Sequence, residues 1–401
     1  MKNQMTLSYT AVQGTYWMYF SVIIAFSSVF LLSKGYTNSE IGVILAVSNI
    51  LSVIMQPILA DIIDRSQKIS LSLVARLVSG VLIVGTLSLL FFEMRSLALS
   101  VVFVLLCTLH ISIQPMINAM AFHYRNGNEP LNFGVARSGG SIAFSMISAL
   151  LGYLAVRFGA VAIPATGVAI LILLLAALIT TERLHNGMSS ARDLDSITFK
   201  PGLEASSITL MSFIRRNGYF VIFSISVMLI FFQNAIINNY MIQIIAAVGG
   251  RSDQMGRLLS FMALLELPGL FFFRRIRFYF SCQTMLKISA FAFVGKVFFT
   301  YLATSVGFIY IAFLFQLISF PFFLSASVHL VDEVMEKGEA VKGQSMLTGM
   351  MTLSAVFGSL IGGVVLDVSG PSILLFYSTI VTVIGVVILM LSVDRVKSKK
   401  V

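Results

Sequence analysis

The chain has 401 residues, of which 58% are hydrophobic and only 11% are charged. Soluble domains carry about 25% charged residues, so this composition excludes an ordinary soluble protein and favours a chain dissolved in a lipid bilayer. The net charge of +10 does not indicate nucleic-acid binding, because the 27 basic residues are scattered between apolar segments.

Apolar segments long enough to cross a bilayer recur along the whole chain. A spanning helix needs about 20 apolar residues, whereas a membrane β-barrel shows strands of about ten residues with alternating polarity. The sequence therefore predicts an all-α membrane protein with twelve transmembrane helices. We place them at 11–33, 40–60, 69–92, 96–122, 131–156, 160–181, 217–247, 254–276, 281–303, 307–331, 341–366 and 371–393.

The distribution of Lys and Arg predicts the orientation in the membrane. The first residues lack the pattern of a cleaved signal peptide, so we expect the first helix to be permanent. With the N-terminus in the cytoplasm, 18 of the 27 basic residues fall in cytoplasmic segments. Cytoplasmic loops carry such an excess, which predicts a multi-pass protein of the cytoplasmic (inner) membrane with both termini in the cytoplasm.

One long polar segment divides the predicted helices into two sets of six. Residues 182–216 are expected to form a cytoplasmic linker between an N-terminal bundle, 1–181, and a C-terminal bundle, 217–401. The two bundles also share a sequence pattern, because Pro57 and Pro268 each precede a charged turn. Paired halves are typical of transporters that rock around a central site.

Several segments carry a family resemblance. They are Gln56–Asp61 with Asp64–Arg65, Phe133–Ser141, Glu266–Leu270, Phe320–Phe323, Gly343–Gln344 and Gly358–Gly363. Together they resemble the major facilitator superfamily, and within it the branch of the lactose permease and the related oligosaccharide and nucleoside proton symporters. The resemblance implies two pseudo-symmetric six-helix bundles and proton-coupled transport of a small polar solute by alternating access.

The same resemblance assigns individual residues and shows where this chain departs from the permease. The helix-five arginine of the permease is matched by Arg137, but its helix-four carboxylate is matched by Asn118. The helix-ten histidine is matched by Gln316, which we include among the expected solute-binding residues. The helix-nine arginine is matched by Lys296, and the helix-eight acid by Glu266. These departures speak against lactose as the solute and imply a shorter proton pathway.

Three charged residues lie deep inside predicted helices: Arg137, Glu266 and Lys296. A charge at the bilayer centre costs about 3 kcal/mol or more, so it persists mainly where it faces a partner or a water-filled cavity. We expect Glu266 to bind the coupling proton and to pair with Lys296 when ionised, and we expect Arg137 to contact the solute. The alternatives are a static ion pair and a packing role for Arg137.

Polar side chains also form stripes along two predicted helices. His110, Gln114 and Asn118 follow one another at intervals of four residues and therefore share one helix face. Asn234 and Asn238 do the same in the seventh helix. We expect these residues to bind the solute in a hydrated hollow between the bundles. Hydrogen bonding between helices is the alternative.

Asp61 and Arg65 lie at the cytoplasmic turn after the second helix. The family resemblance implies that they gate transport, as a latch that bonds across the two halves in the outward-facing state. Ordinary loop charge is the alternative.

The sequence thus predicts a secondary active transporter that imports a sugar-like or other small polar solute with protons and works as a monomer. An exporter, a facilitator and an anion carrier on the same fold stay open. A membrane-embedded enzyme needs a nucleophile with its base, or a metal cluster. The sequence shows neither, so we expect no catalytic residue, no bound metal and no cofactor.

Overall fold

The structure is a computed structural model that describes residues 4–65, 70–124, 131, 133–189, 210–336 and 339–396. All regular elements in these residues are helical. The chain forms two compact units. Unit 1 comprises Met1–Phe199 and Arg251–Leu264, and unit 2 comprises Lys200–Gly250 and Leu265–Val401.

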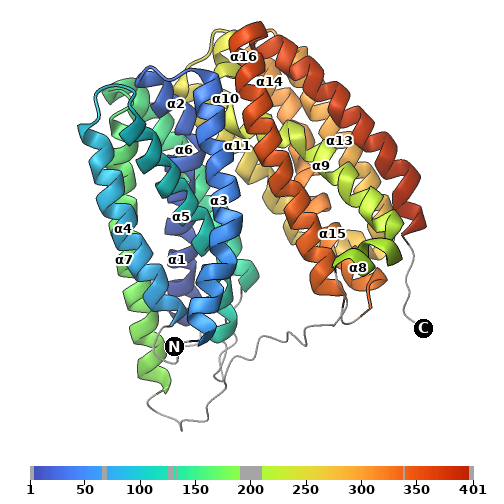
Figure 1. The fold of residues 1–401 in the computed structure, drawn as a ribbon, viewed down its shortest axis with the longest axis horizontal. Coiled ribbons are helices and arrows are strands. Elements are labelled where there is room, and N and C mark those ends of the chain that lie inside the picture. The colour runs from blue at the N-terminus through green and yellow to red at the C-terminus, as the bar shows by residue number, and fades with distance from the viewer. Residues whose placement is uncertain are drawn as a thin grey trace. The chain divides into compact units, whose positions relative to one another are not determined.

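Unit 1 is built from long apolar helices that run alongside one another (Figure 1). Helix α1 packs on α6 and α7, α3 packs on α5, and α4 packs on α5 and α7. The bounds are α1 Gln4–Phe20, α2 Ser27–Ser33, α3 Asn38–Arg65, α4 Leu71–Ser88, α5 Leu97–His123, α6 Phe133–Phe158 and α7 Ala162–Ser189, with the first part of α11, Ser252–Phe271.

The first membrane segment is not a regular α-helix. A π-helical turn, Ser21–Ala25, follows α1, and α2 departs from that direction by 43°. Single π-helical turns inside helices occur frequently at functional sites. The break follows the C-terminal end of α1, the part of the helix that carries Tyr16 and Trp17.

Unit 2 has α9 packed along α16, while α13 packs on α14, α15 and α16. Its core is rich in aromatic side chains, with Phe223, Phe293 and Phe323 almost fully buried. The bounds are α8 Leu210–Arg216, α9 Gly218–Asn239, α10 Met241–Ala247, α12 Phe273–Tyr279, α13 Cys282–Tyr301, α14 Val306–Phe313, α15 Phe320–Val334 and α16 Ala340–Ser392, together with the last part of α11.

Helix α16 consists of two arms that double back at Gly370 (Figure 1). Gly370 has φ +78° and ψ 178°, a conformation that glycine adopts without steric cost. Pro371 follows, and proline suits the first turn of a new helix because it needs no hydrogen bond from its nitrogen. The two arms correspond to the predicted helices 341–366 and 371–393.

The all-α membrane fold is confirmed. Within the described residues, nine helices are long and apolar enough to cross a membrane, or ten if the bent pair α1–α2 is one span. The long helix α16 counts once in that number, although its arms match two predicted helices. Helix α11 is not included, because polar residues such as Arg257 and Glu266 lower its hydropathy. Twelve spans are reached when the bent pair α1–α2, each arm of α16 and α11 are all counted as spans.

The predicted linker is described only at its ends. Helix α7 continues to Ser189 and α8 begins at Leu210, whereas 190–209 lie outside the described residues. The division into 1–181, 182–216 and 217–401 stays a prediction.

Within unit 1, α6 and the first part of α11 approach closely at two glycines. A methyl group on Gly152 would lie 2.5 Å from the carbonyl oxygen of Ser252, and one on Gly256 would collide with the backbone at Ser148. One further contact is a hydrogen bond between the hydroxyls of Ser145 and Ser260, 2.7 Å apart. Small residues are the usual means of bringing membrane helices together.

We predict that Gly152→Ala lowers the unfolding temperature of the protein in detergent. The added methyl group must push α6 and α11 apart, and overpacking of this kind costs about 1–3 kcal/mol. Gly80→Ala in α4 is the matched control, since a methyl group there meets nothing within 4 Å. Equal melting temperatures for the two variants would show that the close approach does not contribute to stability.

Candidate functional site

Unit 2 contains a chain of three polar side chains in its membrane-spanning part. Lys296 Nζ donates a hydrogen bond to Gln316 Oε1 over 2.9 Å. Gln316 Nε2 in turn donates to Glu266 Oε1 over 2.7 Å. Lys296 and Gln316 are buried, and Glu266 is half-buried. The two predicted proton-coupling residues are thus joined through one of the predicted solute-binding residues.

An interruption of the helix places Gln316 between its two partners. Helix α14 ends at Phe313 and continues as a 3₁₀ turn, Leu314–Leu317, before α15 starts at Phe320. Pro321 lies in the first turn of α15 and has no backbone N–H to extend the preceding helix. Non-helical backbone at membrane depth is tolerated where it is buried in protein or lines a cavity.

Lys296 is surrounded by one polar side chain and two aromatic rings besides Gln316. Its ammonium group lies 3.5 Å from Asn234 Oδ1, on α9. The same nitrogen lies 5.2 Å from the ring centroid of Phe293 and 5.9 Å from that of Phe313. Aromatic faces attract cations, more strongly where water is excluded. The site therefore supports a buried ammonium group with hydrogen-bond acceptors and ring faces.

The amide of Gln316 can have only one orientation in this chain of contacts. An ammonium group only donates hydrogen bonds and a carboxylate only accepts them, while an amide does both. The oxygen of Gln316 must face Lys296 and its nitrogen must face Glu266. The amide of Gln316 therefore links the two charged residues in one ordered chain of hydrogen bonds.

In unit 1 a second polar group is centred on Gln13, which the sequence analysis did not select. Gln13 Nε2 donates to Asn118 Oδ1 over 3.1 Å and to the hydroxyl of Tyr9 over 2.7 Å. Tyr9 donates to the carbonyl oxygen of Ile117 over 2.8 Å. The predicted residue Asn118 is therefore held by α1. Gln13 is not part of a stripe of amides in α1, so no such pattern in the sequence marks it as a site residue.

Arg137 lies over the indole ring of Trp17, with 3.9 Å between the guanidinium carbon and the ring centroid. It also donates a hydrogen bond to Ser141 Oγ over 3.1 Å. The indole fits here because position 140 is glycine; a methyl group on Gly140 would lie 2.7 Å from Trp17 Cδ1. Arg137 remains half-buried rather than enclosed. A planar guanidinium held over an aromatic ring keeps a geometry suited to bidentate hydrogen bonding.

His110 is enclosed by aromatic side chains of α1. Its ring is stacked on that of Tyr16, with centroids 4.3 Å apart, and meets the edge of Tyr19 at 5.0 Å. The imidazole is fully buried, and neither of its nitrogens has a hydrogen-bond partner among the described residues. The surroundings of His110 are therefore those of a neutral ring in an aromatic cluster.

The remaining predicted residues lie apart from these contacts. Gln114 and Asn238 are half-buried on α5 and α9. Asp61 and Arg65 form an exposed ion pair of 2.7 Å within α3. Exposed pairs contribute about 0–1 kcal/mol to stability, and the gating role of these two residues stays a prediction.

The described part of the chain offers no group of three His, Cys, Asp or Glu side chains that could hold a metal ion. Its two cysteines, Cys107 and Cys282, are free and buried.

Comparison with known proteins identifies the class: this is a multi-pass membrane transporter of the major facilitator type, and not an enzyme. The chain belongs to the family described as the MFS_1 like family, which matches residues 9–377. The predicted superfamily is thereby confirmed. No curated protein matches the sequence.

Solved structures show the same fold. A crystal structure of a mutant of the nucleoside transporter NupG has a TM-score of 0.82 at 13% identity, covering 97% of this chain and 100% of that chain. Another NupG structure gives 0.79 at 14%, covering 99% and 100%. A bacterial homolog to the human lysosomal transporter Spinster, inward-facing and unoccupied, gives 0.70 at 11%, covering 100% and 99%. At these identities the likeness concerns the fold alone.

We predict that Arg137→Lys weakens solute binding about tenfold or more, which corresponds to about 1.4 kcal/mol. Lysine keeps the charge but loses the planar group that lies on Trp17 and can form paired hydrogen bonds. Binding can be measured by isothermal titration of the purified protein, with Arg157→Lys at the exposed end of α6 as the control. Equal affinities for the two variants would exclude Arg137 from the binding site.

Proposed function

We propose that the chain is a secondary active transporter that moves a small polar solute across the cytoplasmic membrane by alternating access, in symport with protons. The observation that carries this proposal is the buried chain Lys296–Gln316–Glu266 in unit 2. Groups of this kind are costly in a membrane and typically mark ion and proton pathways.

In this mechanism Glu266 is the carboxylate that takes up and releases the coupling proton. When it is ionised, its charge is balanced by Lys296 through the ordered amide of Gln316. When it is protonated, the ammonium group loses that counter-charge and turns to neutral acceptors such as Asn234. The proton thus changes which hydrogen-bond donors and acceptors face the solute.

A sugar-like solute, including the ribose of a nucleoside, suits the polar side chains of unit 1. Amides such as Gln13 and Asn118 can donate to and accept from hydroxyl groups. The guanidinium of Arg137 matches vicinal hydroxyls in a bidentate manner. The similarity in fold to a nucleoside transporter adds support for this class of solute.

An anion carrier is the second candidate. Arg137 and Lys296 place two basic side chains in membrane helices, and a solute with a carboxylate would balance one of them. Thermal-shift measurements against sugars, nucleosides and organic acids distinguish the classes, because a ligand that binds the folded state raises its stability. Stabilisation by acidic solutes alone would favour the anion carrier.

We predict that Glu266→Gln abolishes proton-driven accumulation of the solute and leaves exchange intact. The amide keeps the size of the side chain but cannot take up and release a proton. The measurement is solute uptake into proteoliposomes with an imposed pH gradient, with and without a protonophore, followed by exchange in the absence of a gradient.

Glu40→Gln is the matched control, because Glu40 lies in the first turn of α3 and forms an exposed ion pair with Arg95. It should accumulate solute as the unmodified protein does. Accumulation by Glu266→Gln that a protonophore still abolishes would remove Glu266 from the coupling mechanism. Wild-type uptake that is insensitive to the protonophore would instead indicate a facilitator.

A further inference from the structure

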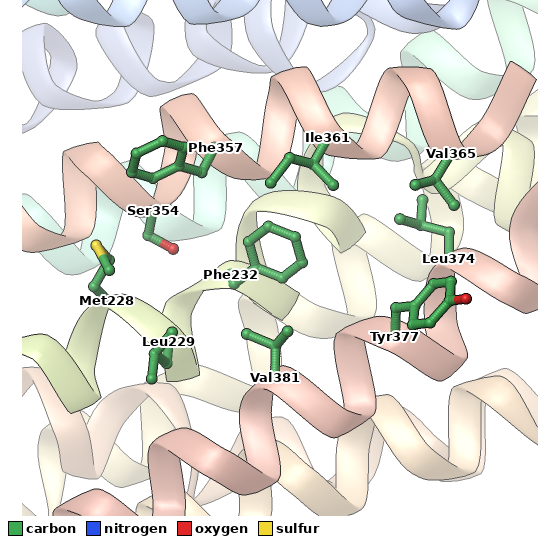
Figure 2. Close-up of a pocket in the computed structure, with 10 residues that line it drawn as sticks. All are labelled: Met228, Leu229, Phe232, Ser354, Phe357, Ile361, Val365, Leu374, Tyr377 and Val381. Carbon is green, nitrogen blue, oxygen red and sulfur yellow. The ribbon is translucent and has the colours of Figure 1, made fainter.

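Unit 2 contains a cavity of about 390 Å³ that has no part in the polar clusters. It lies between α9 and the two arms of α16, and its lining surface is apolar (Figure 2). Phe232 forms its floor on α9, while Ile361 and Val381 face each other from the two arms. A volume in this range is typical of sites for small ligands, which are about 300–1,000 Å³.

The cavity is elongated along the helices. Phe357, Ile361 and Val365 line it at intervals of four residues, and they therefore form one stripe along the first arm of α16. From Ser354 to Val365 this stripe is about 16 Å long at 1.5 Å per residue. The second arm contributes Leu374, Tyr377 and Val381, which also share one face. The shape is that of a groove parallel to the membrane-spanning helices.

The groove opens on an exposed apolar face of α16, a helix long and apolar enough to cross a membrane. Phe357, Ile361 and Tyr377 are 45%, 47% and 53% exposed, although α16 passes the test for a membrane-spanning helix. Exposed apolar side chains on such a helix suit contact with hydrocarbon rather than with water. Phe232, at the floor, is only 8% exposed. A hydrocarbon chain that reaches Phe232 would therefore be enclosed by apolar side chains.

The polar features of the groove are consistent with a hydrocarbon occupant. Ser354 is 1% exposed and its hydroxyl is buried in the wall without a described partner. Tyr377 lies near the end of the groove where Gly370 breaks α16, and a phenol is favoured where one end of a site is apolar and the other is near water. Ser354 and Tyr377 are the lining residues with side-chain oxygens, so the wall offers a sugar-like solute few hydrogen bonds.

We propose that this groove binds one acyl chain of a bilayer phospholipid, lying along α16 with its headgroup on the side of Gly370. The proposal does not depend on the transported solute. It places the lipid chain against α9, the helix that presents Asn234 to Lys296 two residues beyond Phe232.

The test uses the full chain reconstituted in phosphatidylcholine bilayers that contain a fraction of phosphatidylcholine with a diazirine on its acyl chain. After irradiation, mass spectrometry of the peptides shows which residues are labelled. We expect label on Phe232 in addition to exposed residues such as Val383, which is 41% exposed. Lipid that merely surrounds the protein would label Val383 and leave Phe232 unlabelled, and that result would overturn the proposal.

A pair of variants tests whether the label enters through the groove. Val381→Trp fills the cavity and should reduce labelling of Phe232 about tenfold, which corresponds to about 1.4 kcal/mol of binding free energy. Val383→Trp lies on the same arm but outside the lining and should leave it unchanged. If Val381→Trp does not fold, Val365→Trp fills the groove from the other arm. Unchanged labelling in the filled variant would contradict the proposal.

Discussion

The structure depends on the inability of the bilayer core to solvate charged and polar groups. A lysine or a glutamate in that environment is destabilising unless a partner compensates it. In unit 2 the compensation runs from Lys296 through Gln316 to Glu266. Gln316 lies in the 3₁₀ turn before α15, and this turn positions its amide between Lys296 and Glu266. The same constraint explains why Gln13 and Asn118 are bonded to each other in unit 1.

Apolar packing sets the geometry in which these groups meet. Gly140 leaves room for Trp17, whose ring supports Arg137. The glycines at the crossing of α6 and α11 allow the two backbones to touch. The groove between α9 and α16 differs from the polar clusters, because the surface that lines it is apolar. Polar and apolar sites thus occur on the same helices but serve different ligands in our proposals.

The sequence predicted the helices well because length and apolarity are local properties. It also identified Lys296, Glu266 and Arg137, since charges in apolar segments are conspicuous. It did not predict that Gln316 would join Lys296 to Glu266, because that contact depends on how the helix breaks. Gln13 could not be predicted because its partner Asn118 lies on α5, over a hundred residues away. Contacts between helices arise from tertiary packing, which no single helix pattern specifies.

The most direct test of charge compensation in the membrane is a double-mutant cycle on thermal stability. Lys296→Met and Glu266→Gln are measured singly and together in the purified protein. Removing one member of a buried charged pair costs about 3–5 kcal/mol, whereas replacing both can be nearly neutral. The account predicts that the double variant is more stable than either single variant. Losses that simply add would show that the two charges do not interact, and would contradict it.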